Sequence, residues 1–181
     1  MDFLSNTNLQ FFIAAYLIGS IPFGLILAKK FAGVNVKEHG SKSIGATNVL
    51  RVVKESNPQL AKKLGIATVV LDAVKGMIVL FAALALGASE STLWGIAVLS
   101  VLGHCYSIYL GLEGGKGVAT GLGVLLVLIP IPTLIGAVVW GFCAKVLKVS
   151  SLASLFGLIA VVIAAHFFSD SLGVDSYAPL Y

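Results

Sequence analysis

Charged residues are scarce in this sequence: only 11% of its 181 residues are Asp, Glu, Lys or Arg, whereas 58% are hydrophobic. The mean hydropathy is +1.01. These values exclude an ordinary water-soluble domain and indicate a chain that lies in a lipid bilayer. Cysteine is also scarce, with two residues and no CxxC pattern or Cys/His spacing, so neither a disulfide framework nor a metal site is expected.

Familiar catalytic patterns are missing as well. The sequence has no GxSxG nucleophile elbow, no HExxH pair and no His-x4-Asp pair that would serve as a general base. If the chain is an enzyme, its reaction therefore proceeds without a strong protein base.

Long apolar stretches recur along the chain, and the longest approach the roughly 20 residues that a helix needs to cross about 30 Å of hydrocarbon. They predict an all-α, polytopic transmembrane helix bundle with about six spans. The expected spans are residues 11–28, 64–86, 93–110, 118–129, 133–144 and 152–168. The fourth and fifth are short, so we expect them to tilt little, to enter the membrane partially or to borrow residues from neighbouring loops.

Basic residues are confined to alternate loops between these spans. Most of the twelve Lys and Arg lie in residues 29–63, and only Lys75 falls within a span. The opposite loops carry acidic residues alone, namely Asp2, Glu90, Asp170 and Asp175. By the positive-inside rule, we expect residues 29–63 to form a cytoplasmic loop of one membrane domain, residues 1–181. The net charge of +4 then reflects this topology and an anionic ligand or lipid headgroup, not nucleic acid.

The segment GSKSIGATN, residues 40–48, is glycine-rich and polar. Its candidate phosphate ligands are Gly40, Ser41, Ser43, Gly45, Thr47 and Asn48, with Arg51 just beyond. If a helix begins after Ala46, then Thr47, Asn48 and Arg51 fall on one side of it, behind a helix N-terminus that favours a phosphate dianion. The alternative is a solvated loop whose polar side chains only cap a short helix.

A second glycine-rich segment, GGKG, spans residues 114–117. Gly114, Gly115 and Gly117 let the backbone approach a ligand closely, and Lys116 supplies a positive charge. A nucleotide-binding P-loop is disfavoured, because Leu110 stands where that pattern needs its first glycine and Gly117 where it needs Ser or Thr. The alternative is close helix packing with a lysine that snorkels to the membrane surface.

Four further polar residues mark candidate positions. Asp72 and Lys75 lie three residues apart within the second span, where an unpaired charge is costly, so they form an ion pair or contact a ligand. His104 lies toward the end of the third span, as a simple helix-end donor or as part of a phosphate site. Ser151 begins the sixth span, where helix capping is the alternative to ligand binding.

Five motifs follow one another in the order typical of one protein family. They are GSIPFG at residues 19–24, GSKSIGATNVLR at 40–51, LDAVKG at 71–76, GHCYSIYLGLEGGKGVATGLG at 103–123 and SLAS at 151–154. With these motifs the chain resembles, over nearly its whole length, the bacterial acyl-phosphate:glycerol-3-phosphate acyltransferases. Members of that family are integral enzymes of the bacterial inner membrane that begin phospholipid synthesis.

The resemblance implies transfer of a fatty acyl chain from acyl phosphate to the 1-hydroxyl of glycerol 3-phosphate, giving lysophosphatidic acid and phosphate without a cofactor. Acyl phosphate is a mixed anhydride with a good leaving group, and a substrate phosphate is thought to help remove the hydroxyl proton. The implied partners are both substrates, membrane lipids and the enzyme that makes acyl phosphate. The active site is expected to face the cytoplasm.

By motif position, the resemblance also assigns roles to residues. Lys116 would neutralise acyl phosphate, and His104 and Ser151 would complete the pocket. We therefore expect catalytic roles for Ser41, Arg51, His104 and Lys116, substrate binding by Gly40, Ser43, Gly45, Thr47, Asn48, Gly114, Gly115, Gly117 and Ser151, and support from Asp72 and Lys75.

The chain departs from the family pattern in two ways. Relatives commonly have GSGN where this chain has GSKS, so Lys42 stands in place of a glycine and Ser43 in place of an asparagine. Relatives also usually continue into a seventh span and a basic tail that contributes to the site. Two alternatives follow for the region beyond Tyr181: either the natural chain is longer, or the site lacks the part that the seventh span and the tail contribute in relatives.

Two other classes of function compete with an acyltransferase. A transporter of phosphate or an organophosphate anion would also use glycine breaks and basic residues within spans. Against it, the polar motifs cluster at one membrane face, and no inverted repeat is visible. A membrane scaffold without a ligand is the third class.

Overall fold

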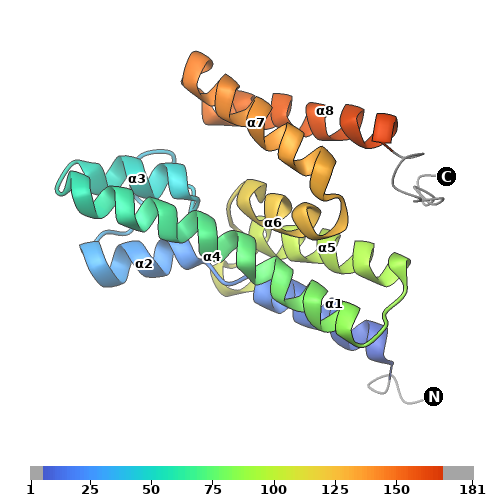
Figure 1. Cartoon of the computed structure of the whole chain (residues 1–181). Coiled ribbons are helices and arrows are strands. Elements are labelled where there is room, and N and C mark those ends of the chain that lie inside the picture. The colour runs from blue at the N-terminus through green and yellow to red at the C-terminus, as the bar shows by residue number, and fades with distance from the viewer. Residues whose placement is uncertain (1–5, 169–181) are drawn as a thin grey trace. The chain divides into compact units, whose positions relative to one another are not determined.

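The computed structural model describes residues 6–168, and its regular structure there is helical (Figure 1). The α-helices are α1 (Thr7–Gly19), α2 (Phe23–Ala32), α3 (Ala46–Lys54), α4 (Pro58–Ala85), α5 (Glu90–Cys105), α6 (Val118–Leu128), α7 (Pro130–Leu147) and α8 (Ser150–Phe168), and the 3-10 helix η2 (Ile108–Leu110) lies between α5 and α6. In this part of the chain no β-strand forms, apart from an isolated bridge between Ser107 and Glu113. The prediction of an all-α fold is confirmed.

The chain divides into two compact units, Met1–Val124 and Leu125–Tyr181. The first unit contains α1 to α5 and the beginning of α6, and the second contains the end of α6 together with α7 and α8. Both glycine-rich segments belong to the first unit. The expectation of one membrane domain stays a prediction.

Four helical stretches of the described chain are long and apolar enough to cross a membrane: Thr7–Ala32, Pro58–Ala85, Pro130–Leu147 and Ser150–Phe168. Helix α5 has 16 residues and α6 has 11, so both are shorter than the expected length of a span. The number of about six spans therefore stays a prediction.

The first of these stretches is not one continuous helix, although residues 11–28 were expected as a single span. Helix α1 ends at Gly19, and α2 begins at Phe23 with Pro22 as its N-cap. Proline has no N–H group and disfavours a helical conformation in the residue before it, so the helix is interrupted at Ile21. The interruption leaves backbone carbonyl groups for other partners.

One other predicted boundary is wrong, and the short fifth span takes in residues of its neighbouring loops, which was one of the alternatives expected for it. Helix α5 ends at Cys105 and not at Leu110, because Tyr106 and Ser107 take up non-helical conformations, and the Ser107 hydroxyl donates to the Ser20 carbonyl at 2.6 Å. Helix α7 is longer than the expected 133–144 and has 18 residues. It begins at Pro130, because the first position of a helix tolerates a missing N–H.

Glycines allow the helices of the first unit to approach closely. A Cβ on Gly103 of α5 would meet the Tyr16 carbonyl oxygen of α1 and, at 2.9 Å, the N atom of Ser20 just after α1, and one on Gly76 of α4 would meet Val124 of α6 at 2.6 Å. Small residues at such crossings let helix backbones pack tightly in a membrane protein. In the second unit, α7 and α8 pack as a pair, with Gly136 and Gly157 at their crossing.

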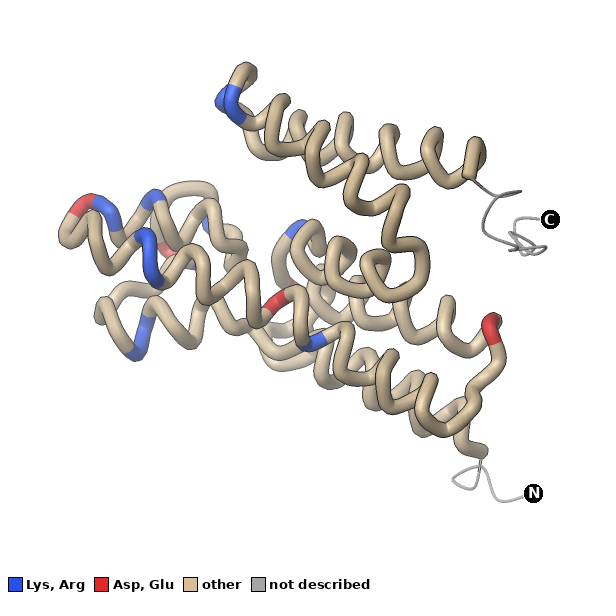
Figure 2. The backbone as a smooth tube through the Cα atoms, in the orientation of Figure 1, with Lys and Arg blue, Asp and Glu red and all other residues tan. Residues whose placement is uncertain are grey.

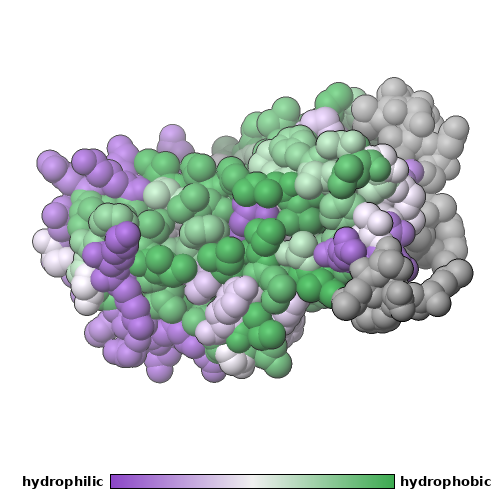
Figure 3. Space-filling view, turned by 90° about the horizontal axis from the view of Figure 1, so that it is seen from below, coloured by the Kyte–Doolittle hydropathy of each residue, from purple (hydrophilic) through white to green (hydrophobic). Residues whose placement is uncertain are grey.

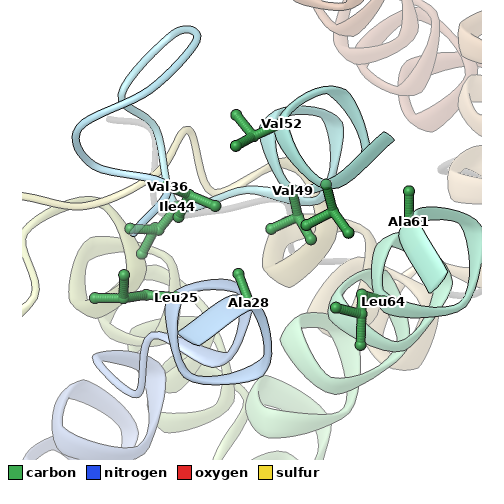
Figure 4. Close-up of a cluster of buried hydrophobic side chains, with 9 residues drawn as sticks. Leu25, Ala28, Val36, Ile44, Val49, Val52, Ala61 and Leu64 are labelled. Atoms are coloured by element: carbon green, nitrogen blue, oxygen red, sulfur yellow. The ribbon is translucent and has the colours of Figure 1, made fainter. Parts of the chain in front are cut away.

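Helices α2, α3 and α4 enclose an apolar cluster beneath the first glycine-rich loop (Figure 4). Val49 of α3 is fully buried, and so are Ala28 of α2 and Ala61 of α4. The other members of the cluster are Leu25, Val36, Ile44, Val52, Val53 and Leu64. Burying a side chain such as valine contributes about 1.5 to 3 kcal/mol, so this cluster anchors α3 and the loop before it.

Charged residues gather at one end of the first unit, where α2 ends and α4 begins (Figure 2). The face turned to the viewer in Figure 3 is hydrophilic at this same end and largely hydrophobic over the helices beyond it. Midway along α4, one acidic and one basic residue interrupt the apolar sequence (Figure 2). They are Asp72 and Lys75, and both are buried.

Candidate active site

Asn48 organises the loop before α3. The two N–H groups of its side-chain Nδ2 face three carbonyl oxygens, those of Val36 and Ser43 at 2.9 Å and that of His39 at 3.2 Å. Its Oδ1 accepts from the backbone N–H of Ser41 at 2.9 Å. The buried amide of Asn48 is therefore occupied by the loop itself, and it shapes the residues around it.

Two residues of this loop adopt a left-handed backbone. Gly40 has a φ of +60°, and a Cβ there would also collide with Asn48 Oδ1. Lys42 has a φ of +58°, a conformation that favours glycine, and it occupies the position at which the resembled family commonly has glycine. At position 42 the loop backbone therefore adopts a left-handed conformation that suits glycine and that is strained for lysine.

The polar side chains at the start of α3 divide between two environments. Ser41, Thr47 and Arg51 are exposed, whereas Asn48 is buried in the loop. A helix does form here, and it begins at Ala46 with Gly45 as its N-cap, one residue earlier than the expected start after Ala46. The expectation that Thr47, Asn48 and Arg51 share one side is wrong for Asn48, because its side chain turns toward the loop backbone. Ser43 is half-buried, and its hydroxyl accepts from the Gly45 N–H at 3.4 Å.

The GGKG segment packs against the end of α5 and requires glycine there. A Cβ on Gly114 would meet the Cys105 carbonyl oxygen at 2.6 Å, and one on Gly117, whose φ is +72°, would meet Val101 at 2.8 Å. Lys116 is exposed. The three glycines therefore hold the segment against the helix, while the lysine side chain remains accessible.

Gly115 packs directly against His104, both at its backbone and at its imidazole ring. Its N–H donates to the His104 carbonyl at 3.0 Å, and a Cβ on it would overlap His104 Nε2. The imidazole therefore fills the space where a side chain of residue 115 would lie. His104 is 3% exposed and forms the floor of the GGKG segment.

A buried polar cluster joins His104 to the middle of α4. Lys75 Nζ lies 2.9 Å from each of three acceptors, which are Asp72 Oδ1, His104 Nδ1 and the Ile21 carbonyl oxygen. The ring of Phe23 is 5.9 Å from the same ammonium group. Asp72 and Lys75 thus form the ion pair that was one of the two alternatives for them, and the broken first span supplies a third acceptor.

An ion pair connects the two glycine-rich loops. Lys37 Nζ lies 2.6 Å from Glu113 Oε2, and this hydrogen-bonded ammonium holds the pKa of the Glu113 carboxyl below its usual value. Leu110 also packs against the apolar cluster beneath the first loop. Sequence reasoning missed Lys37 and Glu113, since local spacing carries no signal for a pair 76 residues apart.

Ser151 lies in the first turn of α8, in the second unit, and is exposed. Every other predicted site residue lies in the first unit. Among residues 6–168, no group of three or more His, Cys, Asp and Glu side chains is placed to hold a metal ion.

Comparison with known proteins agrees with the motifs. A family model described as glycerol-3-phosphate acyltransferase matches residues 9–180. The glycerol-3-phosphate acyltransferase of Aliarcobacter butzleri is 71% identical over 181 residues, which are 100% of this chain and 87% of the relative. That of Sulfurimonas denitrificans is 67% identical over 165 residues, 91% of this chain and 81% of the relative.

Solved structures give the same result. The crystal structure of PlsY (YgiH), an integral membrane glycerol 3-phosphate acyltransferase in its glycerol 3-phosphate form, matches with a TM-score of 0.78 and 36% identity, covering 90% of this chain and 78% of that one. The lysophosphatidic acid form of the same enzyme matches with a TM-score of 0.73, again at 36% identity, and covers 90% and 77% of the two chains. Family, sequence relatives and fold agree, and this chain belongs to the glycerol-3-phosphate acyltransferase family of integral membrane proteins.

Proposed function

We propose that this chain transfers a fatty acyl group from acyl phosphate to the 1-hydroxyl of glycerol 3-phosphate, at a site on the cytoplasmic face of the bacterial inner membrane. The observation that carries the proposal is the pair of linked loops. One loop leads into α3 with its exposed Arg51, the other carries the exposed Lys116, and the Lys37–Glu113 ion pair connects them. Two cations on adjoining loops suit a reaction in which both substrates carry a phosphate.

Buried groups support each loop, so the exposed groups of the loop are positioned before substrate arrives. The side chain of Asn48 orders the first loop by hydrogen bonds to the loop's backbone carbonyls, and His104 and α5 support the second loop. Preorganised charges and donors are the largest contribution that such a site makes to catalysis, because they require no reorganisation during the reaction. Ser41 and Thr47 would add hydroxyl donors to phosphate oxygens.

The proposed reaction needs no strong base from the protein. The hydroxyl oxygen of glycerol 3-phosphate forms an ester bond with the acyl carbonyl carbon, and the bond from that carbon to the anhydride oxygen breaks. Inorganic phosphate leaves with the electron pair of the broken bond, and the hydroxyl proton passes to a phosphate oxygen of a substrate. Lys116 and Arg51 would stabilise the negative charge that shifts onto phosphate.

The test uses the full chain in lipid nanodiscs with palmitoyl phosphate and glycerol 3-phosphate. We expect equal amounts of phosphate and lysophosphatidic acid, and no product with palmitoyl-CoA as donor or glycerol as acceptor. Lys116→Ala and Arg51→Ala should each lower kcat/KM at least about 100-fold, as does the loss of a charge-stabilising group in other enzymes. Lys63→Ala, which removes an exposed lysine at the start of α4, is the matched control and should leave turnover unchanged.

Two outcomes would overturn the proposal. One is acylation from palmitoyl-CoA but not from palmitoyl phosphate. The other is uptake of glycerol 3-phosphate into sealed vesicles without any acylated product, which would favour the transporter alternative.

A further inference from the structure

The hydrogen bonds of the buried cluster formed by Asp72, Lys75 and His104 have a defined donor-to-acceptor direction. A lysine ammonium has three N–H donors and no acceptor, and Lys75 uses all three, toward Asp72, Ile21 and His104. His104 Nδ1 is therefore an acceptor. In a neutral imidazole whose Nδ1 accepts, the proton resides on Nε2.

The other ring nitrogen faces the GGKG segment. A Cβ on Gly115 would overlap His104 Nε2, so this nitrogen is directed at the segment's backbone. No residue in the described part of the chain accepts a hydrogen bond from it. A nearly buried histidine thus presents a donor, without a protein partner, beside the exposed Lys116.

A positively charged imidazole is disfavoured at this position. Its Nδ1 would carry a proton that points at the Lys75 ammonium 2.9 Å away, and two cations at that separation repel each other. Asp72 Oδ1 accepts from Lys75 at 2.9 Å but lies 3.6 Å from His104 Nδ1, which is too far for a hydrogen bond that would stabilise a proton there. The cluster therefore favours a neutral ring with a fixed tautomer over a ring that collects a proton.

We propose that Asp72 and Lys75 are positioning residues that hold His104 as the neutral Nε2–H tautomer beneath the GGKG segment, where it donates to a phosphoryl oxygen of a bound substrate. This inference rests on the proposed function and deepens it. His104 acts in it as a donor and not as the base that removes the hydroxyl proton. The break in the first span takes part as well, because it frees the Ile21 carbonyl that completes the coordination of Lys75.

The tautomer can be measured without turnover. The chain contains three histidines, so nitrogen-15 NMR of histidine-labelled protein in nanodiscs resolves His104 once His39→Gln and His166→Gln have assigned the other two. We expect wild-type His104 to show a protonated Nε2 and an unprotonated, hydrogen-bonded Nδ1. Addition of glycerol 3-phosphate should shift the Nε2–H signal. An Nδ1–H tautomer, an imidazolium, or an Nε2–H signal that glycerol 3-phosphate leaves unmoved would overturn the proposal.

The supporting pair is tested by removing both charges together. Lys75→Met alone would leave a buried, unpaired carboxylate, whereas Asp72→Asn with Lys75→Met leaves none. We expect the double variant to fold and to show a mixture of the two His104 tautomers. Thr68→Val changes another buried polar residue of α4, whose hydroxyl donates only to the Leu64 carbonyl, and should leave the His104 signals unchanged. A double variant that folds and keeps the pure Nε2–H tautomer would contradict the positioning role.

Kinetics separate a donor from a base. His104→Gln keeps an N–H donor at the end of the side chain but cannot take up a proton, so we expect it to retain at least about tenfold more kcat than His104→Ala, as one hydrogen bond to a charged group allows. Equal loss in both variants would assign His104 the role of base and overturn the proposal. If wild-type protein transfers no acyl group, the proposed function fails, while the tautomer measurement still decides the arrangement of the cluster.

Discussion

Lys37 Nζ and Glu113 Oε2 lie 2.6 Å apart and join the loop before α3 to the loop before α6. The two residues are 76 positions apart, so their contact joins two glycine-rich segments that are distant in the sequence. Glu113 is well exposed, so dissolved salt screens this link.

Breaking this link should weaken substrate binding more than folding. Glu113→Gln removes the carboxylate, and we expect a higher KM for glycerol 3-phosphate with little change in the melting temperature, since an exposed ion pair contributes little to stability. The charge-swapped double variant, Lys37→Glu with Glu113→Lys, should restore the wild-type KM. A KM that is the same in all three proteins would show that the link does not position the loops.

The same pair predicts a pH dependence of defined sign. Lys37 lowers the pKa of Glu113 in the folded protein, so the contribution of the pair is complete above the unfolded value of about 4.3 and is lost as the pH falls through the lowered pKa. At neutral pH the KM effect should therefore be constant with pH but should shrink as salt rises. Steady-state kinetics from neutral to acidic pH, at low and at high salt and with Glu113→Gln as the control, measure how KM depends on pH and on salt.

Replacing Lys42 by glycine should stabilise the protein. The left-handed conformation costs a non-glycine residue roughly 1 to 2 kcal/mol, and the greater freedom of glycine in the unfolded chain offsets part of this, so we expect a net gain of up to about 1 kcal/mol. Lys30→Gly is the control, because Lys30 lies in the last turn of α2, where glycine should destabilise. Thermal unfolding of the two variants should move in opposite directions. A lower melting temperature for Lys42→Gly would contradict the strain.

Asn48 and Thr47 are neighbours in α3 and should respond differently to alanine. Asn48→Ala leaves three loop carbonyls and one N–H without their partner, and we expect a loss of about 1 to 3 kcal/mol of stability together with most of the activity. Thr47→Ala removes an exposed side chain and should change the stability by less than about 0.5 kcal/mol. Any effect of Thr47→Ala on KM then reports contact with substrate. Chemical unfolding and kinetics on both variants distinguish a framework residue from a ligand.

The sequence predicts the helical, membrane-embedded character of the fold but not its interruptions. Apolar composition acts over whole segments and so identifies a span, whereas the break at Ile21 depends on a proline and on partners far along the chain. Lys75 and Ser107 supply those partners from other parts of the first unit. The early end of α5 has the same cause, because Ser107 leaves the helix to reach the carbonyl of Ser20.

The sequence predicts which residues gather at the candidate site better than it predicts what each of them does there. The glycines of both segments indicate close backbone approach, and the structure shows what most of them approach: α5 in the second segment and Asn48 in the first. Asn48 was expected among the phosphate ligands, yet its hydrogen bonds are directed at the loop. The contact between Lys75 and His104 joins residues 29 positions apart on different helices, which no local spacing reveals.

A methyl group on Gly115 should disable the site without unfolding the chain. The Cβ of alanine would overlap the His104 ring, which has no room to move because Lys75 holds its other side, so the GGKG segment must lift away from α5. Displacing a charged group by about 1 Å can cost a factor of 100 in rate, so we expect a loss of that order in kcat/KM for Gly115→Ala. Gly121→Ala is the matched control, because its Cβ would lie 3.9 Å from Val101, an ordinary contact, and alanine favours a helix. The measurement is kcat, KM and melting temperature for both variants in nanodiscs. Full activity in Gly115→Ala would mean that the segment is not seated on His104, and an inactive but folded Gly121→Ala would mean that α6, rather than this contact, controls the site.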